Sequence, residues 1–236
     1  MRGRVVGWSF VGSAILGGGM LLSRPPAWLL DWLAARHPGC LYRVPVQAPM
    51  IALTLDDGPD PATTPLILAE LRRYRAQATF FLITERVKNR EQLVHQVVAE
   101  GHEIGNHFTQ DRPSIRLTAN QFTEDLEEAH GVLAPYGAVR WARPGSGLYS
   151  QPMVAAMKRK GYRCALGSVY PYDATIPSVA FASWYIRRNV RPGAILILHD
   201  GGARGRRTAR ILRSVLPALQ RQGFRVVSLS ELAAAA

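Results

Sequence analysis

Ionisable side chains in this sequence recur directly after short apolar runs that are typical of buried strands. They are Asp56, Asp57, His107, Arg143, His199 and Asp200. Because the carboxyl ends of parallel strands meet at one edge of a sheet, we expect these side chains to share one site. Each has an ordinary alternative, since Asp-Asp-Gly-Pro is a good turn and isolated histidines or arginines are usually structural. Their common position at strand ends favours a functional site.

Two of these residues could bind a metal ion. Asp57 offers an oxygen ligand and His107 offers a nitrogen ligand. Asp111 follows His107 by one helical turn's spacing, so we expect it on the same side of a helical turn. A shell of two or three protein ligands would leave room for a water molecule, as hydrolytic metal sites require.

The remaining residues could supply acid–base chemistry. Hydrolysis of an unactivated amide needs a nucleophile made from water and an acid that protonates the leaving amine. We expect Asp56 to act as the base, His199 to act as the acid, and Arg143 to keep Asp56 ionised. The sequence therefore predicts metal-assisted hydrolysis of an amide.

The elements that must position these residues alternate between strand and helix from Met50 onward. Strands are predicted at 50–55, 78–82, 103–107, 162–166, 194–198 and 225–229, and residues 141–145 are predicted to end a further strand. Helices are predicted after Asp60-Pro61, over 87–98, after a capping box at Thr118–Gln121, around Met153–Met157, and over 179–190 and 208–222. This alternation predicts one α/β domain with a mainly parallel sheet. The lack of a phosphate-binding glycine loop favours barrel-like closure over an open nucleotide-binding sheet.

An apolar segment precedes this domain. Residues 5–23 carry no charge, follow Arg2 and Arg4, and approach the minimum length for crossing a bilayer. A small-residue cleavage site is lacking before Arg24, which favours an uncleaved anchor over a signal peptide. We therefore expect a hydrophobic, signal-anchor-like helix at 1–23, an amphipathic helix and connector at 24–49, and the catalytic domain at 50–236, attached to a membrane through 5–23 and lying outside the cytoplasm.

Composition and charge narrow the class of protein. The chain has 236 residues, of which 47% are hydrophobic and 19% charged, and this excludes a disordered protein. Cys40 and Cys164 are the only cysteines, so an all-cysteine metal site is excluded, and two buried free thiols are favoured over a disulfide. The net charge of +12 favours anionic surroundings such as lipid headgroups or an acidic glycan. The scattered arginines argue against a nucleic-acid track.

Four motifs resemble those of a known family. Thr54–Pro59 (TLDDGP), Gly101–His107 (GHEIGNH), Arg143–Gly147 (RPGSG) and Leu196–Asp200 (LILHD) occur in the order seen in the polysaccharide deacetylases of carbohydrate esterase family 4, the NodB-homology proteins. The resemblance covers about Met50 to Leu229. It implies a distorted (β/α) barrel of the NodB-homology type that removes N-acetyl groups from chitin-like glycans or peptidoglycan. It also implies one divalent metal ion, zinc first, with cobalt, manganese or nickel as alternatives.

The resemblance implies the roles already expected from the residues: Asp56 as the base, His199 as the acid, Arg143 as the partner of the base, and Asp57 and His107 as metal ligands. It also places an aspartate beside the acid His199, and Asp173 is the matching candidate. Asp111 stands where the second metal-binding histidine is usual, so the metal shell would be harder and more anionic, and the bound water less acidic. Ser146 and Ala174 stand where aromatic residues are common, which predicts a more open sugar subsite.

The sequence thus favours a metal-dependent hydrolase that removes N-acetyl groups from an amino-sugar polymer or oligomer of chitooligosaccharide or peptidoglycan type. The alternative is a catalytically weak family member that binds cell-envelope glycan, with Asp111 marking decay of the metal site. A third hypothesis, a basic protein that binds nucleic acid or lipid, requires Arg204–Arg213 to form one contiguous basic face. The oligomeric state is not indicated.

Overall fold

The fold is built around one long buried strand. The structure is a computed structural model that describes residues 6–7, 32, 35 and 39–236. Strand β3 (Met50–Gly58) has nine residues, all of them buried. A strand covered on both faces explains why its first six residues are almost continuously apolar. It pairs in parallel with β4 (Thr79–Leu82), β9 (Ile195–His199) and β10 (Arg225–Val227).

The sheet is parallel and curled. From β4 the order continues through β5 (Glu103–Asn106), β6 (Trp141–Ala142), β8 (Arg163–Ala165) and β2 (Cys40–Leu41). A parallel bridge between Val169 and Leu196 sets the chain that follows β8 beside β9, so the two sides of the sheet approach each other. The predicted parallel α/β domain is confirmed, and this curled sheet agrees with a distorted (β/α) fold.

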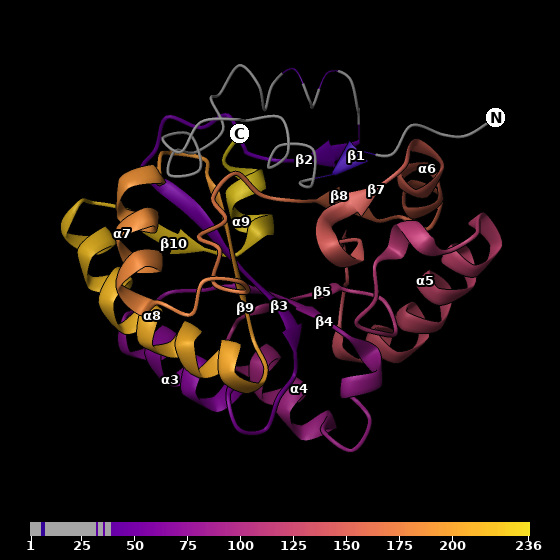
Figure 1. The fold of residues 1–236 in the computed structure, drawn as a ribbon, viewed down its shortest axis with the longest axis horizontal. Helices are drawn as coiled ribbons and strands as arrows, with labels where there is room; N and C mark the ends of the chain where they lie inside the picture. The colour runs from indigo at the N-terminus through magenta and orange to yellow at the C-terminus, as the bar shows by residue number, and fades with distance from the viewer. Residues whose placement is uncertain (1–5, 8–31, 33–34, 36–38) are drawn as a thin grey trace.

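Helices surround the strands in an arc (Figure 1). They are α3 (Thr64–Arg73), α4 (Glu91–Ala99), α5 (Ala119–Leu133), α6 (Gln151–Arg159), α7 (Val179–Asn189), α8 (Gly202–Arg221) and α9 (Leu229–Ala234). Short 3₁₀ turns lie at Thr84–Arg86, Ser114–Arg116, Ala134–Tyr136 and Gly145–Gly147, and β1 (Val6–Gly7) pairs antiparallel with β7 (Leu148–Tyr149). The largest buried cluster joins β3, β4 and β9 to α3, α7 and α8 and includes Leu53, Phe80, Leu196, Ile211 and Leu212. This core holds the strand ends in place.

Two helix starts differ from the sequence prediction. Helix α3 begins at Thr64 after the N-cap Thr63, because the Asp60 side chain accepts the Ala62 N–H at 2.8 Å and closes a turn ahead of the helix. Helix α8 begins at Gly202, ahead of the predicted start at Thr208. The capping box at Thr118–Gln121 is confirmed at the start of α5.

Most of the predicted N-terminal helix at 1–23 lies outside the described residues. The two residues of it that the structure describes, Val6 and Gly7, form strand β1 instead of a helix. Glycine costs about 1 kcal/mol in a helix interior, which weakens a helix there. Among the described residues, no helix is both long and apolar enough to cross a membrane.

The start of the globular unit precedes Met50. Strand β2 pairs with β8, and the side chains of Tyr42 and Val44 are buried, so this part of the predicted connector at 24–49 packs onto the sheet. Cys40 and Cys164 are register partners in this pair. Both are buried free thiols, as predicted, and their Sγ atoms lie 2.7 Å apart.

Candidate active site

A buried ion pair forms the floor of the site. Asp56, near the end of β3, accepts a hydrogen bond from Arg143 Nη1 at 2.5 Å. Arg143 is 2% exposed and also donates to the Thr54 hydroxyl at 2.9 Å and to the carbonyls of Ala165 and Leu166 at 2.9 and 3.1 Å. A charge so buried persists only when it is paired and hydrogen-bonded. Arg143 therefore fixes the position of Asp56.

The predicted acid is held by the predicted aspartate. His199 Nδ1 lies 2.9 Å from Asp173 Oδ2, and the same carboxylate accepts the His199 backbone N–H at 3.0 Å. Burial alone would lower the pKa of His199, but the hydrogen bond and attraction of Asp173, with the charges of Asp56 and Asp57, raise it above its usual value. His199 is also the register partner of Asp56 on the neighbouring strand. The structure thus brings the two residues of the predicted acid–base pair together.

Two predicted metal ligands converge beside this floor. His107 Nδ1 lies 2.6 Å from the Arg143 carbonyl oxygen, so that nitrogen carries the proton and donates it. The other ring nitrogen, Nε2, lies 3.6 Å from Asp57 Oδ1. Metal-binding histidines characteristically donate their second ring N–H in this way, which fixes the ring. Both side chains are buried.

Asp111 does not join them. The residues after His107 form an irregular loop instead of the predicted helical turn, because Phe108 adopts a left-handed φ of 68° and buries its ring. The Asp111 side chain is 53% exposed and pairs with Arg86 at 3.1 Å and Arg204 at 3.8 Å. Within the described ranges, no three His, Cys, Asp or Glu side chains lie close enough together to hold a metal ion. The predicted three-ligand shell is not assembled in this structure.

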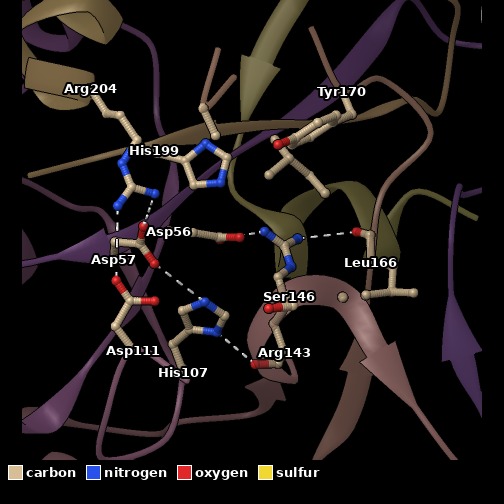
Figure 2. Close-up of a pocket in the computed structure, with 13 residues that line it drawn as sticks. Asp56, Asp57, His107, Asp111, Arg143, Ser146, Leu166, Tyr170, His199 and Arg204 are labelled. Carbon is tan, nitrogen blue, oxygen red and sulfur yellow. Dashed lines mark hydrogen bonds and ion pairs between the residues drawn. The ribbon is translucent and has the colours of Figure 1, made fainter. Parts of the chain in front are cut away.

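Arg204, from the first turn of α8, is the residue that sequence reasoning missed here. Its guanidinium contacts Asp57 Oδ2 at 2.9 Å and reaches Asp111 as well (Figure 2). A positive charge therefore already lies against both carboxylates, while the other Asp57 oxygen faces His107. This donor set fits a divalent cation, since the carboxylates attract a cation and the free His107 nitrogen can ligate one.

Asp200 has a structural position. It is 1% exposed and accepts hydrogen bonds from the hydroxyls of Thr63 and Thr64 and from the Gly201 N–H. Burial raises its pKa, although these hydrogen bonds oppose the shift. Asp200 therefore ties the end of β9 to the start of α3.

A cavity of about 340 Å³ connects these groups (Figure 2). It is lined by Asp56, Asp57, His107, Asp111, Arg143, His199 and Arg204, and by Ser146, Gly147, Leu166, Tyr170, Ala174 and Ile197. Tyr170, which sequence reasoning also missed, packs edge-on against His199 with ring centroids 5.9 Å apart. Its place in the same stretch as Asp173 is the signal that could have found it. Ser146 and Ala174 both line the cavity, as expected for the positions where aromatic residues are common.

The arginine side chains of α8 contact different parts of the protein. Arg204 enters the cavity, Arg207 donates to the Asp173 carbonyl at 2.6 Å, and Arg213 pairs with Glu70 at 2.6 Å. Residues Arg204–Arg213, all described by the structure, therefore do not form the contiguous basic face that a nucleic-acid or lipid-binding protein would require.

Comparison with known proteins identifies similar sequences and folds. A family model described as polysaccharide deacetylase matches residues 43–165. A peptidoglycan-N-acetylglucosamine deacetylase of Bacillus cereus is 36% identical over 199 residues, 81% of this chain and 91% of that protein. A chitooligosaccharide deacetylase of Bradyrhizobium sp. is 34% identical over 197 residues, 77% of this chain and 90% of that protein.

A solved structure with the same fold is that of a carbohydrate esterase family 4 pseudoenzyme from Bacillus anthracis, in a mutant form with restored enzymatic activity. It has a TM-score of 0.77 and 26% sequence identity, and the match covers 83% of this chain and 71% of that chain. Both active and inactive proteins are thus found on this fold.

Proposed function

Because this chain belongs to the polysaccharide deacetylase family, we propose that it removes N-acetyl groups from an amino-sugar polymer or oligomer of peptidoglycan or chitooligosaccharide type. The family makes it a hydrolase that acts on amide bonds. The observation that carries the proposal is the single cavity in which Asp56 and His199, each held by its own buried partner, lie beside Asp57 and His107.

Asp56 would accept the proton of the attacking water. Arg143 Nη1 donates to Asp56 Oδ1, which leaves the second oxygen of the carboxylate for the water. As the water oxygen bonds to the acetamide carbon, its proton passes to Asp56. The carbon–nitrogen bond then breaks and acetate leaves.

His199 would protonate the departing amine. Asp173 accepts the Nδ1–H, so the acidic proton lies on Nε2. The raised pKa of His199 keeps the ring protonated at higher pH than an isolated histidine, which suits a general acid.

Asp57 and His107 would hold a divalent metal ion, with Asp111 as the third ligand once Arg204 has moved. Such an ion would polarise the acetamide carbonyl and make the attacking water more acidic. Zinc is the first candidate, and the carboxylate-rich shell also suits manganese, cobalt or nickel.

The test is acetate release from N-acetylated oligosaccharides and peptidoglycan. The full chain is stripped with a chelator and reloaded separately with zinc, cobalt, manganese or nickel. We expect release to be lost on stripping and restored by at least one metal. A folded chain that releases no acetate with any of the four would contradict the proposal.

A second function is favoured by one observation, the Arg204 guanidinium that lies against two of the predicted ligands. In that case the protein binds glycan with little or no turnover. Glycan binding that persists after chelation, together with no acetate release, would support this alternative.

We also propose attachment to a membrane through 5–23, with the catalytic domain outside the cytoplasm. The support is the uncharged run that follows Arg2 and Arg4. Recovery of the full chain in the membrane fraction of expressing cells, with the catalytic domain accessible to external protease, tests this proposal.

A further inference from the structure

A second cavity adjoins the active site and shares Arg204 with it. It has a volume of about 490 Å³. Three guanidinium groups line it, those of Arg86, Arg90 and Arg204, together with the carboxyl groups of Asp60 and Asp200. Because Arg204 lines both cavities, a group bound in the second cavity would lie next to a substrate bound in the first.

The two carboxyl groups of the second cavity are directed to other partners. Asp200 is buried and bonded to Thr63, Thr64 and Gly201. Asp60 accepts the Ala62 N–H at 2.8 Å and the Gly202 N–H at 2.9 Å. These carboxylates are therefore engaged by hydrogen bonds within the protein and form part of the cavity wall.

Two of the three guanidinium groups are held by the active site. Arg204 pairs with Asp57 and Asp111, and Arg86 pairs with Asp111 at 3.1 Å and donates to the Asp57 carbonyl. Arg90 donates to the Arg86 carbonyl at 3.2 Å, which holds its guanidinium at the cavity wall. The charges of Arg86 and Arg204 are thus neutralised by carboxylates that the proposed function assigns to a metal ion.

A divalent cation and the Arg204 guanidinium cannot both occupy the space against Asp57 and Asp111, because like charges at contact distance repel strongly. The backbone of α8 cannot yield. A Cβ atom on Gly205 would lie 2.5 Å from Thr63 Oγ1, so the first turn of the helix is packed directly against the start of α3. The long, part-exposed Arg204 side chain can move instead, and the cavity that it also lines is beside it.

We propose that the second cavity binds an oxyanion, a phosphate or carboxylate group attached to the amino-sugar substrate, and that Arg204 exchanges Asp57 and Asp111 for this oxyanion when the metal binds. The inference rests on the proposed function, because the metal ion and the acetamide occupy the first cavity. Arginine suits the exchange, since its planar guanidinium binds carboxylate and phosphate groups with equal geometric ease.

The exchange couples the binding of the metal ion to the binding of the oxyanion. Metal binding releases two guanidinium charges to the second cavity, and an oxyanion there draws Arg204 away from the metal ligands. By linkage, each ligand strengthens the binding of the other by the same factor. Coupling between two sites of this kind is typically about 5–150-fold.

Calorimetric titration of the full chain with cobalt chloride, with and without sulfate, measures this coupling. Sulfate serves as a divalent oxyanion that keeps cobalt in solution. We expect sulfate to tighten cobalt binding about fivefold or more. Arg204→Gln should tighten cobalt binding without sulfate and abolish the effect of sulfate. Arg90→Gln should leave cobalt binding without sulfate unchanged and weaken the effect of sulfate, and the exposed Arg210→Gln on the same helix should behave like the wild type.

Substrate kinetics identify the source of the oxyanion. The Michaelis constants of the cobalt enzyme are compared for N-acetylglucosamine, N-acetylglucosamine 1-phosphate and N-acetylmuramic acid. We expect a lower KM for the phosphate or the carboxylate sugar than for the neutral one, and we expect Arg90→Gln to remove that advantage. The sugar with the lower KM identifies whether the second cavity binds a phosphate or a carboxylate group.

Three results overturn the inference. If sulfate does not change the cobalt affinity of the wild type, the exchange is excluded. The proposed function still stands in that case if the enzyme releases acetate. Sulfate coupling with no advantage for either anionic sugar excludes a substrate-borne oxyanion and leaves a free anion as the occupant. A folded chain that binds no cobalt removes this inference together with the metal-dependent function.

Discussion

The floor and the rim of the active site differ in how firmly their charges are held. The floor consists of Asp56, Arg143, His199 and Asp173, and the rim of Asp111, Arg86 and Arg204. The Arg143 and Asp173 side chains are 2% and 0% exposed, whereas those of Asp111 and Arg204 are 53% and 38% exposed. Breaking a buried ion pair costs about 3–5 kcal/mol, and an exposed pair contributes about 0–1 kcal/mol. The floor therefore has one arrangement, and the rim can exchange partners.

The largest expected effect is on catalysis at the floor. Asp56→Asn removes the proposed base and should lower kcat about 10²–10⁴-fold, the usual contribution of general base catalysis. Cobalt affinity should remain close to that of the wild type, because Asp57 and His107 are unchanged. Acetate release and calorimetry on the same preparation check both expectations. Retention of most of the activity would show that another group accepts the proton.

The next effect concerns stability. Arg143→Ala leaves the buried Asp56 carboxylate without a partner and should lower the free energy of unfolding by about 3–5 kcal/mol. Asp111→Ala removes an exposed carboxylate of the rim and should change it by about 1 kcal/mol or less. Urea unfolding of the two variants tests the contrast. Equal losses would mean that the rim is as firmly held as the floor.

The pH dependence of activity should respond to Asp173. Because Asp173 raises the pKa of His199, Asp173→Asn should lower that pKa. An acid works only while it is protonated, so the alkaline limb of the kcat/KM profile should move to lower pH. Tyr172→Phe, a change beside Asp173 in the chain that keeps the Asp173 carboxylate, is the matched control and should leave the limb in place. A profile that is the same in Asp173→Asn and the wild type would remove His199 from the role of acid.

The smallest expected effect is at Asp111. Asp111→Asn should change the free energy of unfolding by less than about 1 kcal/mol, since its partners Arg86 and Arg204 keep their contacts with Asp57. High salt should remove even this difference, because exposed charges are screened. Thermal unfolding at low and high ionic strength measures it.

Three residues of the floor, Asp56, Arg143 and His199, could be predicted from the sequence because each follows an apolar run whose end is visible locally, whereas Asp173 was indicated only by the family resemblance. Asp56 lies near the end of the buried strand β3, after its apolar first residues, and His199 ends β9, whose other residues are all buried and apolar. The parallel pairing of these two strands is then enough to place the two residues next to each other.

The rim could not be predicted in the same way. The helix expected at Thr208 begins at Gly202, because Gly201 and Gly202 resemble a loop in sequence while packing against α3 gives the helix its first turn. Arg204 therefore precedes the predicted helix, and the sequence does not indicate that its side chain enters the site. The position of Asp111 depends on the left-handed conformation of Phe108, which residue spacing does not encode.

The register of β3 and β9 sets a length scale for the chemistry. Asp56 and His199 are paired residues on adjacent strands, so the backbone positions of the proposed proton acceptor and proton donor are separated by the interstrand spacing of about 4.8 Å. That spacing is a property of the peptide backbone and does not depend on which sugar is bound. Loops around the cavity can thus change to accept a different glycan, while the backbone positions of the two proposed acid–base residues keep the same separation.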